Sequence, residues 1–204
     1  NSGYTSSFAL VSPEVHRGNY YDDYAFRSLT GFDNAGFPAA TIDAKGYVTG
    51  SVITVLGSST KLYSANYYDF EGRITKTVQG NLLEGYDTTN TVYTFTGKPK
   101  TVTHTHSASG KSTRTEVYTY TYDHADRISK VRHSLGGTSI TLYDATYDNF
   151  GRLLTKQYHG TSTNKLTYAY NLRSWLTGIS GTRFTQNLYY NTAVGTAKYN
   201  RSIC

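Results

Sequence analysis

Two histidines, His104 and His106, are the first residues whose type and spacing suggest chemistry. They lie at positions i and i+2 in VTHTHS, so on a strand both side chains project from one face. Two such imidazoles could supply half of a metal site. No third ligand has supporting spacing. The sequence therefore favours exposed strand histidines over a metal centre, and we expect no cofactor.

Acidic residues near the amino terminus are a second candidate site. Asp22, Asp23, Asp33 and Asn34 carry the oxygen ligands that Ca²⁺ prefers. The stretch DNAG lacks the rest of a calcium loop, so we interpret these residues as turn formers. The later aspartates each have an Arg or Lys partner across a hairpin, which favours a structural role over the convergent carboxylates of glycoside hydrolysis.

Nucleophile and nucleotide motifs are absent from the sequence. It has no G-x-S-x-G, P-loop or dinucleotide fingerprint, and its single cysteine, Cys204, is the last residue. We therefore expect no enzyme. Trp175, the only tryptophan, is the last candidate. An exposed indole beside tyrosine can stack on a sugar ring, whereas the alternative is that Trp175 fills a packing gap at an irregular turn.

The composition limits the partners of the 204-residue chain. Its net charge is +6 and its pI is near 9.2, but the Lys and Arg residues are scattered and no nucleic-acid module is present. We expect no nucleic-acid partner. No apolar run of about 18 residues occurs, so we expect no membrane span. Tyrosine is enriched, with 21 residues, and favours β-structure. The start at Asn1 leads us to expect a processed piece of a longer protein.

A short frame recurs along the chain. It reads YDFEGRI from Tyr68, YDHADRI from Tyr122 and YDNFGRL from Tyr147, with looser copies from Tyr93 and Tyr170. Degenerate or partial copies begin at Ile42 and Tyr190. The steps between copies are 20 to 29 residues, which is typical of a repeat architecture.

Each copy has the residues of a hairpin turn. Asp148 suits the first position of a type I turn, and Gly151 suits the left-handed residue that closes a three-residue loop with a bulge. Asp148 then lies opposite Arg152 on the outer side, and Tyr147 lies opposite Leu153 on the core side. Tyr47 and Trp175 break the rule for the basic position. Asp126 and Ser174 replace the glycine, and Ser174 makes this turn type less favourable.

The residues that define the repeat are Tyr68, Asp69, Gly72, Arg73, Tyr93, Gly97, Lys98, Tyr122, Asp123, Arg127, Tyr147, Asp148, Gly151, Arg152, Tyr170 and Asn171. The flanks alternate, as in VYTYTYD, with tyrosines on one side of a strand and threonines on the other. Second turns are predicted at Gly80–Asn81, Ser109–Gly110, Gly136–Gly137 and Gly160. Successive hairpins must pair edge to edge, because a lone hairpin cannot bury its face.

We therefore predict an all-β fold with little helix: a curved, twisted antiparallel sheet of tandem hairpins. Residues 41–204 form this sheet, and residues 1–40 form an irregular segment packed on it, within a single domain. In that segment Ser12–Val15 could cap a short helix, and HRGNYYDDYAF could be an edge strand.

The frame resembles the YD repeat of RHS-family (rearrangement hot spot) proteins between Tyr63 and Gly195. YNLRSWLTGIS and LYYNTAVG resemble versions in Bacteroidetes RHS-type surface proteins. The resemblance implies a secreted or cell-surface bacterial location and a β-shell that encloses a C-terminal toxin or effector in full-length relatives. It also implies carbohydrate binding. The chain has fewer repeats than a complete shell and lacks the family's core after the repeats. It would form an arc whose sheet edges favour self-association.

Two functions remain open. The first is a non-catalytic structural module that scaffolds or encapsulates as part of a β-shell. The second is a carbohydrate-binding surface module that uses exposed Tyr and Trp residues. Tyrosine rings packed on one buried face favour the first, and a row of rings on a solvent face with polar neighbours favours the second.

Overall fold

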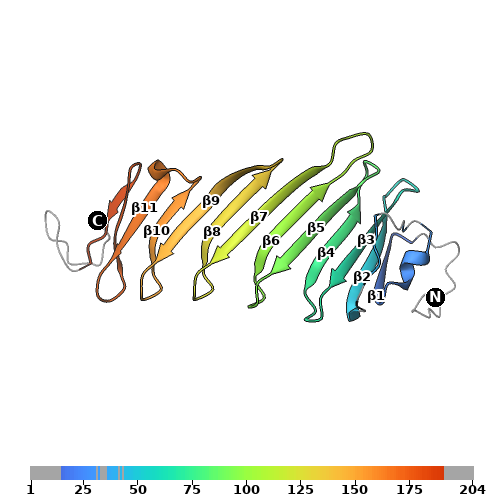
Figure 1. The fold of residues 1–204 in the computed structure, drawn as a ribbon, viewed down its shortest axis with the longest axis horizontal. Coiled ribbons are helices and arrows are strands. Elements are labelled where there is room, and N and C mark those ends of the chain that lie inside the picture. The colour runs from blue at the N-terminus through green and yellow to red at the C-terminus, as the bar shows by residue number, and fades with distance from the viewer. Residues whose placement is uncertain (1–14, 31, 33–35, 41, 43, 191–204) are drawn as a thin grey trace. The chain divides into compact units, whose positions relative to one another are not determined.

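The computed structural model describes residues 15–30, 32, 36–40, 42 and 44–190. It confirms the all-β prediction: thirteen antiparallel strands form an open sheet in which β1 to β13 follow their order in the sequence (Figure 1). Helix is limited in this part of the chain to two short 3-10 segments, η1 (Ala25–Ser28) and η2 (Ser162–Asn164). None of the described helices is long and apolar enough to cross a membrane.

The chain divides into two compact units. We call residues 1–90 and 104–113 the N-terminal unit, and residues 91–103 and 114–204 the C-terminal unit. The first unit contains β1 (Arg17–Asp22), β2 (Ala44–Thr54), β3 (Lys61–Tyr68) and β4 (Ile74–Gly80). The division falls within β5 (Tyr86–Tyr93) and β6 (Pro99–His106), and the turn between these strands belongs to the C-terminal unit.

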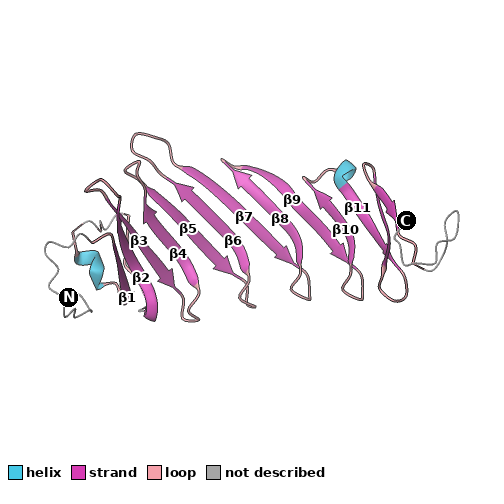
Figure 2. Cartoon of the chain, turned by 180° about the vertical axis from the view of Figure 1, so that it is seen from behind, coloured by secondary structure: helices cyan, strands magenta, loops and turns pink. Residues whose placement is uncertain are grey.

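The C-terminal unit continues with seven strands. They are β7 (Arg114–Tyr122), β8 (Ile128–Leu135), β9 (Thr138–Tyr147), β10 (Leu153–Tyr158), β11 (Lys165–Tyr170), β12 (Leu176–Gly181) and β13 (Thr185–Asn187). In Figure 2, η2 lies at an end of β10 and β11 rather than across a face of the sheet.

A hydrophobic core fills one face of the N-terminal unit. Ala65 on β3 pairs with Val78 on β4 and with Gly50 on β2, so all three share a face. The segment after β1 covers that face with aromatic side chains. The buried cluster consists of Phe26, Phe32, Phe37, Ala65, Tyr67 and Val78. The rings meet at edge and stacked angles, with centroids 4.6 to 5.9 Å apart.

The C-terminal unit lacks such a core within its described residues. Ala145 is its one buried hydrophobic residue there, and its large side chains are half-buried or exposed. Its stability must therefore come from strand pairing and from side-chain contacts along the sheet, rather than from a second layer.

The described part of the segment up to residue 40 is more regular than expected. Residues 17–22 form strand β1, which pairs antiparallel with β2, as the edge-strand alternative predicted. Ala25 and Phe26, at the end of that strand candidate, lie instead in the 3-10 helix η1, whose first backbone N–H donates to the Asp23 carboxylate at 3.0 Å. Residues 12–14, where a helix cap was considered, lie outside the described residues.

The predicted second turns lie where the structure places chain reversals. Residues 81–85, 107–113, 136–137 and 159–164 join β4–β5, β6–β7, β8–β9 and β10–β11. Alternate turns of such a meander lie at the same end of the strands. In the C-terminal unit, the β5–β6, β7–β8, β9–β10 and β11–β12 turns therefore share the lower edge in Figure 1.

Candidate functional site

The repeat turns share one hydrogen-bond pattern. In the β9–β10 turn, Asp148 N donates to Arg152 O at 2.9 Å and Gly151 N donates to Asp148 O at 2.9 Å. Asp148 Oδ1 accepts from the backbone N–H groups of Phe150 and Arg152. Tyr147 pairs with Leu153, which is the register expected from the sequence. One carboxylate therefore satisfies most donors of the tight turn.

An ion pair closes each turn that has both charged residues. The guanidinium of the arginine lies 2.7 or 2.8 Å from the carboxylate four residues before it. These pairs are Asp69–Arg73 in the N-terminal unit, and Asp123–Arg127 and Asp148–Arg152 in the C-terminal unit. The hydrogen bond from the Arg127 side chain lowers the pKa of Asp123 to about 2. The carboxylates of these pairs therefore have structural partners.

The turn at Asn171 has the same backbone pattern, although it lacks a carboxylate and a glycine. Asn171 N donates to Trp175 O, and Ser174 N donates to Asn171 O. Asn171 Oδ1 accepts from the N–H groups of Arg173 and Trp175. Ser174 adopts φ 61°, and Asp126 adopts φ 60° in its own turn. The expectation of an irregular turn beside Trp175 is wrong, because the Asn171 amide accepts the bonds that Asp148 accepts elsewhere.

Tyrosine hydroxyl groups join neighbouring hairpins in a series of equivalent bonds. The tyrosine that begins one repeat donates its hydroxyl hydrogen to the backbone carbonyl of the residue after the preceding turn. The bonds in the C-terminal unit are Tyr122–Pro99, Tyr147–Ile128, Tyr170–Leu153 and Tyr190–Leu176, at 2.7 to 3.1 Å. The N-terminal unit has Tyr68–Val48, at 2.8 Å. We call this series the tyrosine ladder.

In three ladder bonds of the C-terminal unit, the carbonyl that accepts belongs to the residue after a basic residue. The side chain of that basic residue packs on the ring of the tyrosine that donates the bond. In the C-terminal unit, the charged group of Lys98, Arg127 or Arg152 lies 5.5, 4.3 or 4.7 Å from the ring centroid of the next repeat's tyrosine. These distances are those of cation–π contacts. The basic residue therefore binds its own turn and the next hairpin together.

Aromatic residues occupy this stacking position where the sequence lacks a basic residue. Tyr47 stacks on Tyr68 with centroids 4.9 Å apart, and Trp175 packs on Tyr190 with centroids 5.0 Å apart. These two positions depart from the basic residue of the repeat but keep its packing on the next tyrosine ring. A signal in the sequence could have predicted this packing. In both copies an aromatic residue stands where the other copies have Arg or Lys, and the next copy begins with a tyrosine.

The remaining repeat residues lie in the expected places along the strands. Tyr93 ends β5, and Gly97 closes the next turn with φ 81°. Gly97 N donates to Thr94 O at 3.0 Å, and Thr94 N donates to Lys98 O. Gly72 and Gly151 have φ 76° and 82° in their turns.

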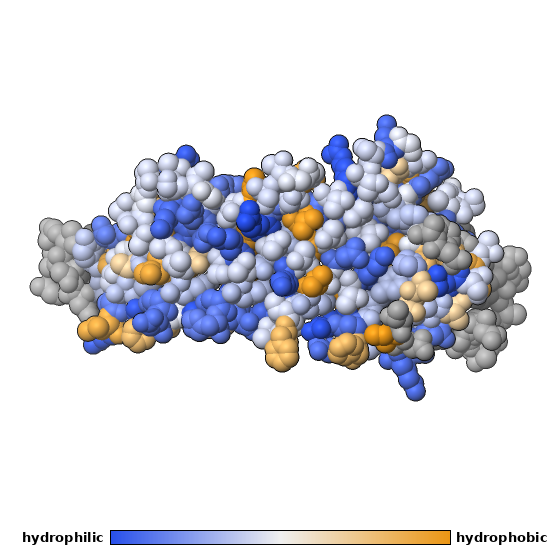
Figure 3. Space-filling view, viewed as in Figure 1, coloured by the Kyte–Doolittle hydropathy of each residue, from blue (hydrophilic) through white to orange (hydrophobic). Residues whose placement is uncertain are grey.

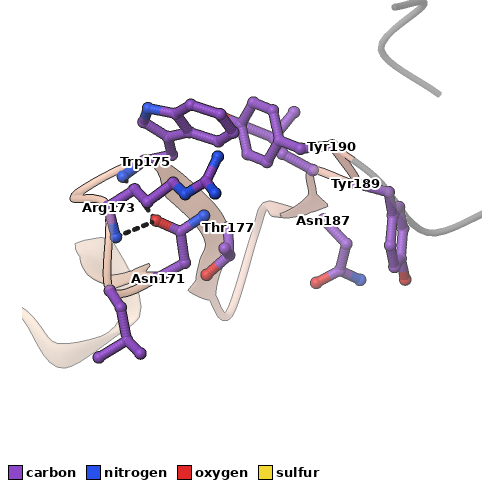
Figure 4. Close-up of a pocket in the computed structure, with 9 residues that line it drawn as sticks. Asn171, Arg173, Trp175, Thr177, Asn187, Tyr189 and Tyr190 are labelled. Atoms are coloured by element: carbon purple, nitrogen blue, oxygen red, sulfur yellow. Dashed lines mark hydrogen bonds between the residues drawn. The ribbon is translucent and has the colours of Figure 1, made fainter.

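A cavity of about 570 Å³ lies beside Trp175. Figure 4 shows the indole of Trp175 and the ring of Tyr190 side by side above the cavity, with the amides of Asn171 and Asn187 and the hydroxyl of Thr177 nearby. Arg173 lies over the indole, 5.4 Å from its ring centroid. Trp175 is 40% exposed. Aromatic faces bordered by amide and hydroxyl groups can bind a polyhydroxylated ligand.

A second aromatic surface covers one face of the C-terminal unit. Tyr143 pairs with Tyr158 on β10, and strand alternation places Tyr118, Tyr120 and Tyr168 on the same face. Partial burial and the hydrogen bond to Tyr147 raise the pKa of Tyr143 to about 12. The Lys156 ammonium lies 5.0 Å from the Tyr158 centroid. These rings have polar neighbours and stay accessible to solvent.

The histidine and acidic candidates have local partners in the N-terminal unit. His106 Nδ1 contacts the Asp87 carboxylate, and His104 Nδ1 contacts the Thr89 hydroxyl at 3.0 Å. Asp22 Oδ1 accepts from Gly46 N. No group of three metal-ligating side chains gathers in the part of the chain that the structure describes. Residues 33 and 34 of the calcium candidate lie outside that part.

No protein-family model and no curated protein matches this chain.

Proposed function

We propose that the chain is a non-catalytic structural repeat module of an exported, RHS-type bacterial surface protein. In this role it scaffolds or encapsulates as part of a curved β-shell. The tyrosine ladder carries the proposal. The repeat's aspartates, its basic residues and the ladder tyrosines are engaged in their own turn or in a neighbouring hairpin, which favours a role in sheet continuity for these residues.

Packing within the N-terminal unit supports the same role. The rings of Tyr63 and Tyr67 pack in or against the aromatic core, and Tyr67 donates its hydroxyl hydrogen to Pro38 O at 2.8 Å. By the criterion that separates the two functions, tyrosines that contact the cover of the sheet are structural. The half-buried and exposed tyrosines of the C-terminal unit meet the criterion for carbohydrate binding.

Deletion of one complete repeat tests the module. Removing residues 122–146 places Tyr147 where Tyr122 was. The Tyr147 hydroxyl can then donate to Pro99 O, and the Lys98 ammonium can pack on the Tyr147 ring. We expect the shortened chain to unfold cooperatively with a β-type circular dichroism spectrum. The control deletion, residues 122–134, removes half of the ladder unit and should abolish cooperative unfolding. Equal damage from both deletions would contradict a modular scaffold.

A second candidate function is carbohydrate binding at the Trp175 cavity. It is favoured by the half-exposed indole, the adjacent Tyr190 ring and the amides of Asn171 and Asn187. A glycan array probed with the full chain tests it, followed by titration of any hit. Trp175→Ala should abolish binding and Trp175→Phe should retain part of it. An array without hits at high micromolar protein removes this function and leaves the scaffold proposal intact.

A further inference from the structure

Large apolar side chains occupy the tips of three turns in the C-terminal unit. Phe95 and Leu172 are fully exposed, and Phe150 is 82% exposed. They lie in the β5–β6, β11–β12 and β9–β10 turns, which share one edge of this unit. Figure 3 shows apolar side chains along the lower edge of the molecule, where these turns lie. The N-terminal unit has the same feature at its β3–β4 turn, where Phe70 is 85% exposed.

The turn geometry does not require these residues to be apolar. The bonds that these turns share come from Asp148 or Asn171 and from the residue at the left-handed position, and the side chains of Phe150 and Leu172 take no part in them. An isolated exposed apolar residue is ordinary, but three of the four tips on this edge share this character. The fourth, the β7–β8 turn, carries His124, Ala125 and Asp126 instead. Adjacent strands lie about 4.8 Å apart, so the tips of successive hairpins, such as those of Phe150 and Leu172, follow at about 10 Å, and Phe95 lies about 20 Å from Phe150.

The backbone at these tips is largely satisfied from within. Phe150 N bonds Asp148 Oδ1 at 2.9 Å, and Arg173 N bonds Asn171 Oδ1 at 2.9 Å. In the third turn, Thr94 Oγ1 accepts from Lys98 N at 3.1 Å. Moving such a turn out of bulk water therefore exposes few unpaired donors to an apolar medium, which lowers the cost of that transfer.

Basic side chains lie directly behind the tips. Arg152 lies 5.1 Å from the Phe150 ring centroid, and Arg173 follows Leu172. The Lys98 ammonium donates to Asp126 O and lies over Tyr122, and Arg173 lies over Trp175. Neither side chain forms an ion pair with the described residues, so no carboxylate neutralises its charge. The sequence of the whole C-terminal unit has thirteen Lys and Arg residues against five Asp and Glu residues, an excess of +8. The N-terminal unit has seven against nine, a net charge of −2.

We propose that the edge formed by Phe95, Phe150 and Leu172 docks on the surface of an anionic lipid bilayer. The three apolar side chains enter the boundary between headgroups and acyl chains, and the basic side chains behind them remain among the anionic headgroups. A row of apolar tips backed by positive charge matches that layered partner. The proposal does not depend on the scaffold function.

Vesicle sedimentation with the full chain tests the docking edge. One set of vesicles contains phosphatidylcholine alone, and the other contains phosphatidylcholine mixed with phosphatidylglycerol. We expect the chain to partition onto the mixed vesicles, with weaker binding to neutral ones. The triple variant F95S/F150S/L172S should lose about tenfold or more in partition coefficient, because the interfacial apolar contacts are gone. The variant K98A/R173A should weaken binding to anionic vesicles selectively.

The matched control uses exposed leucines elsewhere in the chain. Leu56, Leu82 and Leu83 lie in turns of the N-terminal unit at the opposite ends of its strands from Phe70. The variant L56S/L82S/L83S should bind as the unmodified chain does. Circular dichroism and thermal unfolding of each variant check the fold.

Three results would overturn the proposal. The first is an unmodified chain that stays in the supernatant with both vesicles. The second is equal binding by the unmodified chain and the F95S/F150S/L172S variant, which would assign the attraction to net charge alone. The third is a chain that is dimeric in solution and becomes monomeric in that variant without vesicle binding, which would make the edge a contact between copies.

Discussion

Turn residues in this chain have a second function besides setting the backbone conformation. A Cβ atom on Gly72 would lie 2.4 Å from the Tyr47 hydroxyl and 2.9 Å from its Cζ atom. The glycine is therefore required by its φ of 76° and by the ring of the preceding repeat. The turn glycine and the stacking ring depend on each other at this position.

Substitution of Gly72 by alanine separates these two requirements. Gly57 has φ 73° and open space around it, so Gly57→Ala should cost only the backbone strain of about 1–2 kcal/mol. Gly72→Ala should cost about 1 kcal/mol more, because Tyr47 must leave its stacked position on Tyr68. Chemical denaturation measures both. The extra cost should vanish in a Tyr47→Ala background, and its persistence there would contradict the steric explanation.

The carboxylate of Asp123 makes the β7–β8 turn sensitive to acid. Its pKa in the folded chain is about 2, below the ordinary value of 3.8, so the stability it contributes is complete above that ordinary value. This contribution is lost as the pH falls towards about 2. The difference in unfolding free energy between the unmodified chain and Asp123→Asn should therefore shrink over that range in urea titrations.

The control for this titration is Asn171→Ala. Asn171 accepts hydrogen bonds from the equivalent backbone groups through an uncharged amide, so the effect of its removal should stay constant with pH. A difference for Asp123→Asn that is equally constant would show that the carboxylate does not titrate as described.

At the scale of hairpins, the ladder explains how a single layer of strands is held in register without a core. Strand pairing links the backbones, and each ladder bond links one hairpin to the turn of the preceding one. A bulge beside each turn displaces the tyrosine along the strand. In the β9–β10 hairpin, Thr146 pairs with Thr155 but the next residue, Tyr147, pairs with Leu153. The tyrosine ring then reaches the neighbouring hairpin.

Removal of one ladder hydroxyl measures the value of this link. Tyr147→Phe deletes the bond to Ile128 O and the hydroxyl interaction with Tyr143, and keeps the ring under the Arg127 guanidinium. We expect a loss of about 1 kcal/mol in unfolding free energy, because a part-exposed carbonyl loses its donor. Tyr120 lies in the same unit and its hydroxyl donates to no described residue, so Tyr120→Phe should change stability by less than about 0.5 kcal/mol. Equal effects would leave the ladder without a stabilising role.

At the scale of the whole molecule, the two units differ in how they are stabilised. The N-terminal unit has an aromatic core under a covering segment, whereas the described part of the C-terminal unit has Ala145 as its one buried hydrophobic residue. The same substitution should therefore have very different effects in the two units.

Phenylalanine-to-alanine substitutions test this contrast. Phe37 is 1% exposed and packs on Phe32 and Tyr86, so Phe37→Ala should lower the unfolding free energy by about 3–5 kcal/mol. Phe95→Ala, at a fully exposed tip, should change it by no more than about 0.5 kcal/mol. Denaturant unfolding followed by circular dichroism provides both values. A similar loss from both variants would contradict the assignment of the core to the N-terminal unit.

The sequence alone determined the all-β class, the turn positions and the pairing of Tyr147 with Leu153. These features follow from local rules: Asp and Gly fix the turn, and alternation fixes the strand. The tertiary structure decided what the repeated side chains contact. The cation–π contact of Arg127 joins residues twenty positions apart in the sequence, and the stacking of Tyr47 and Trp175 depends on the spacing of adjacent hairpins. Which face the N-terminal aromatics cover was also a tertiary outcome, because burial depends on where distant segments meet.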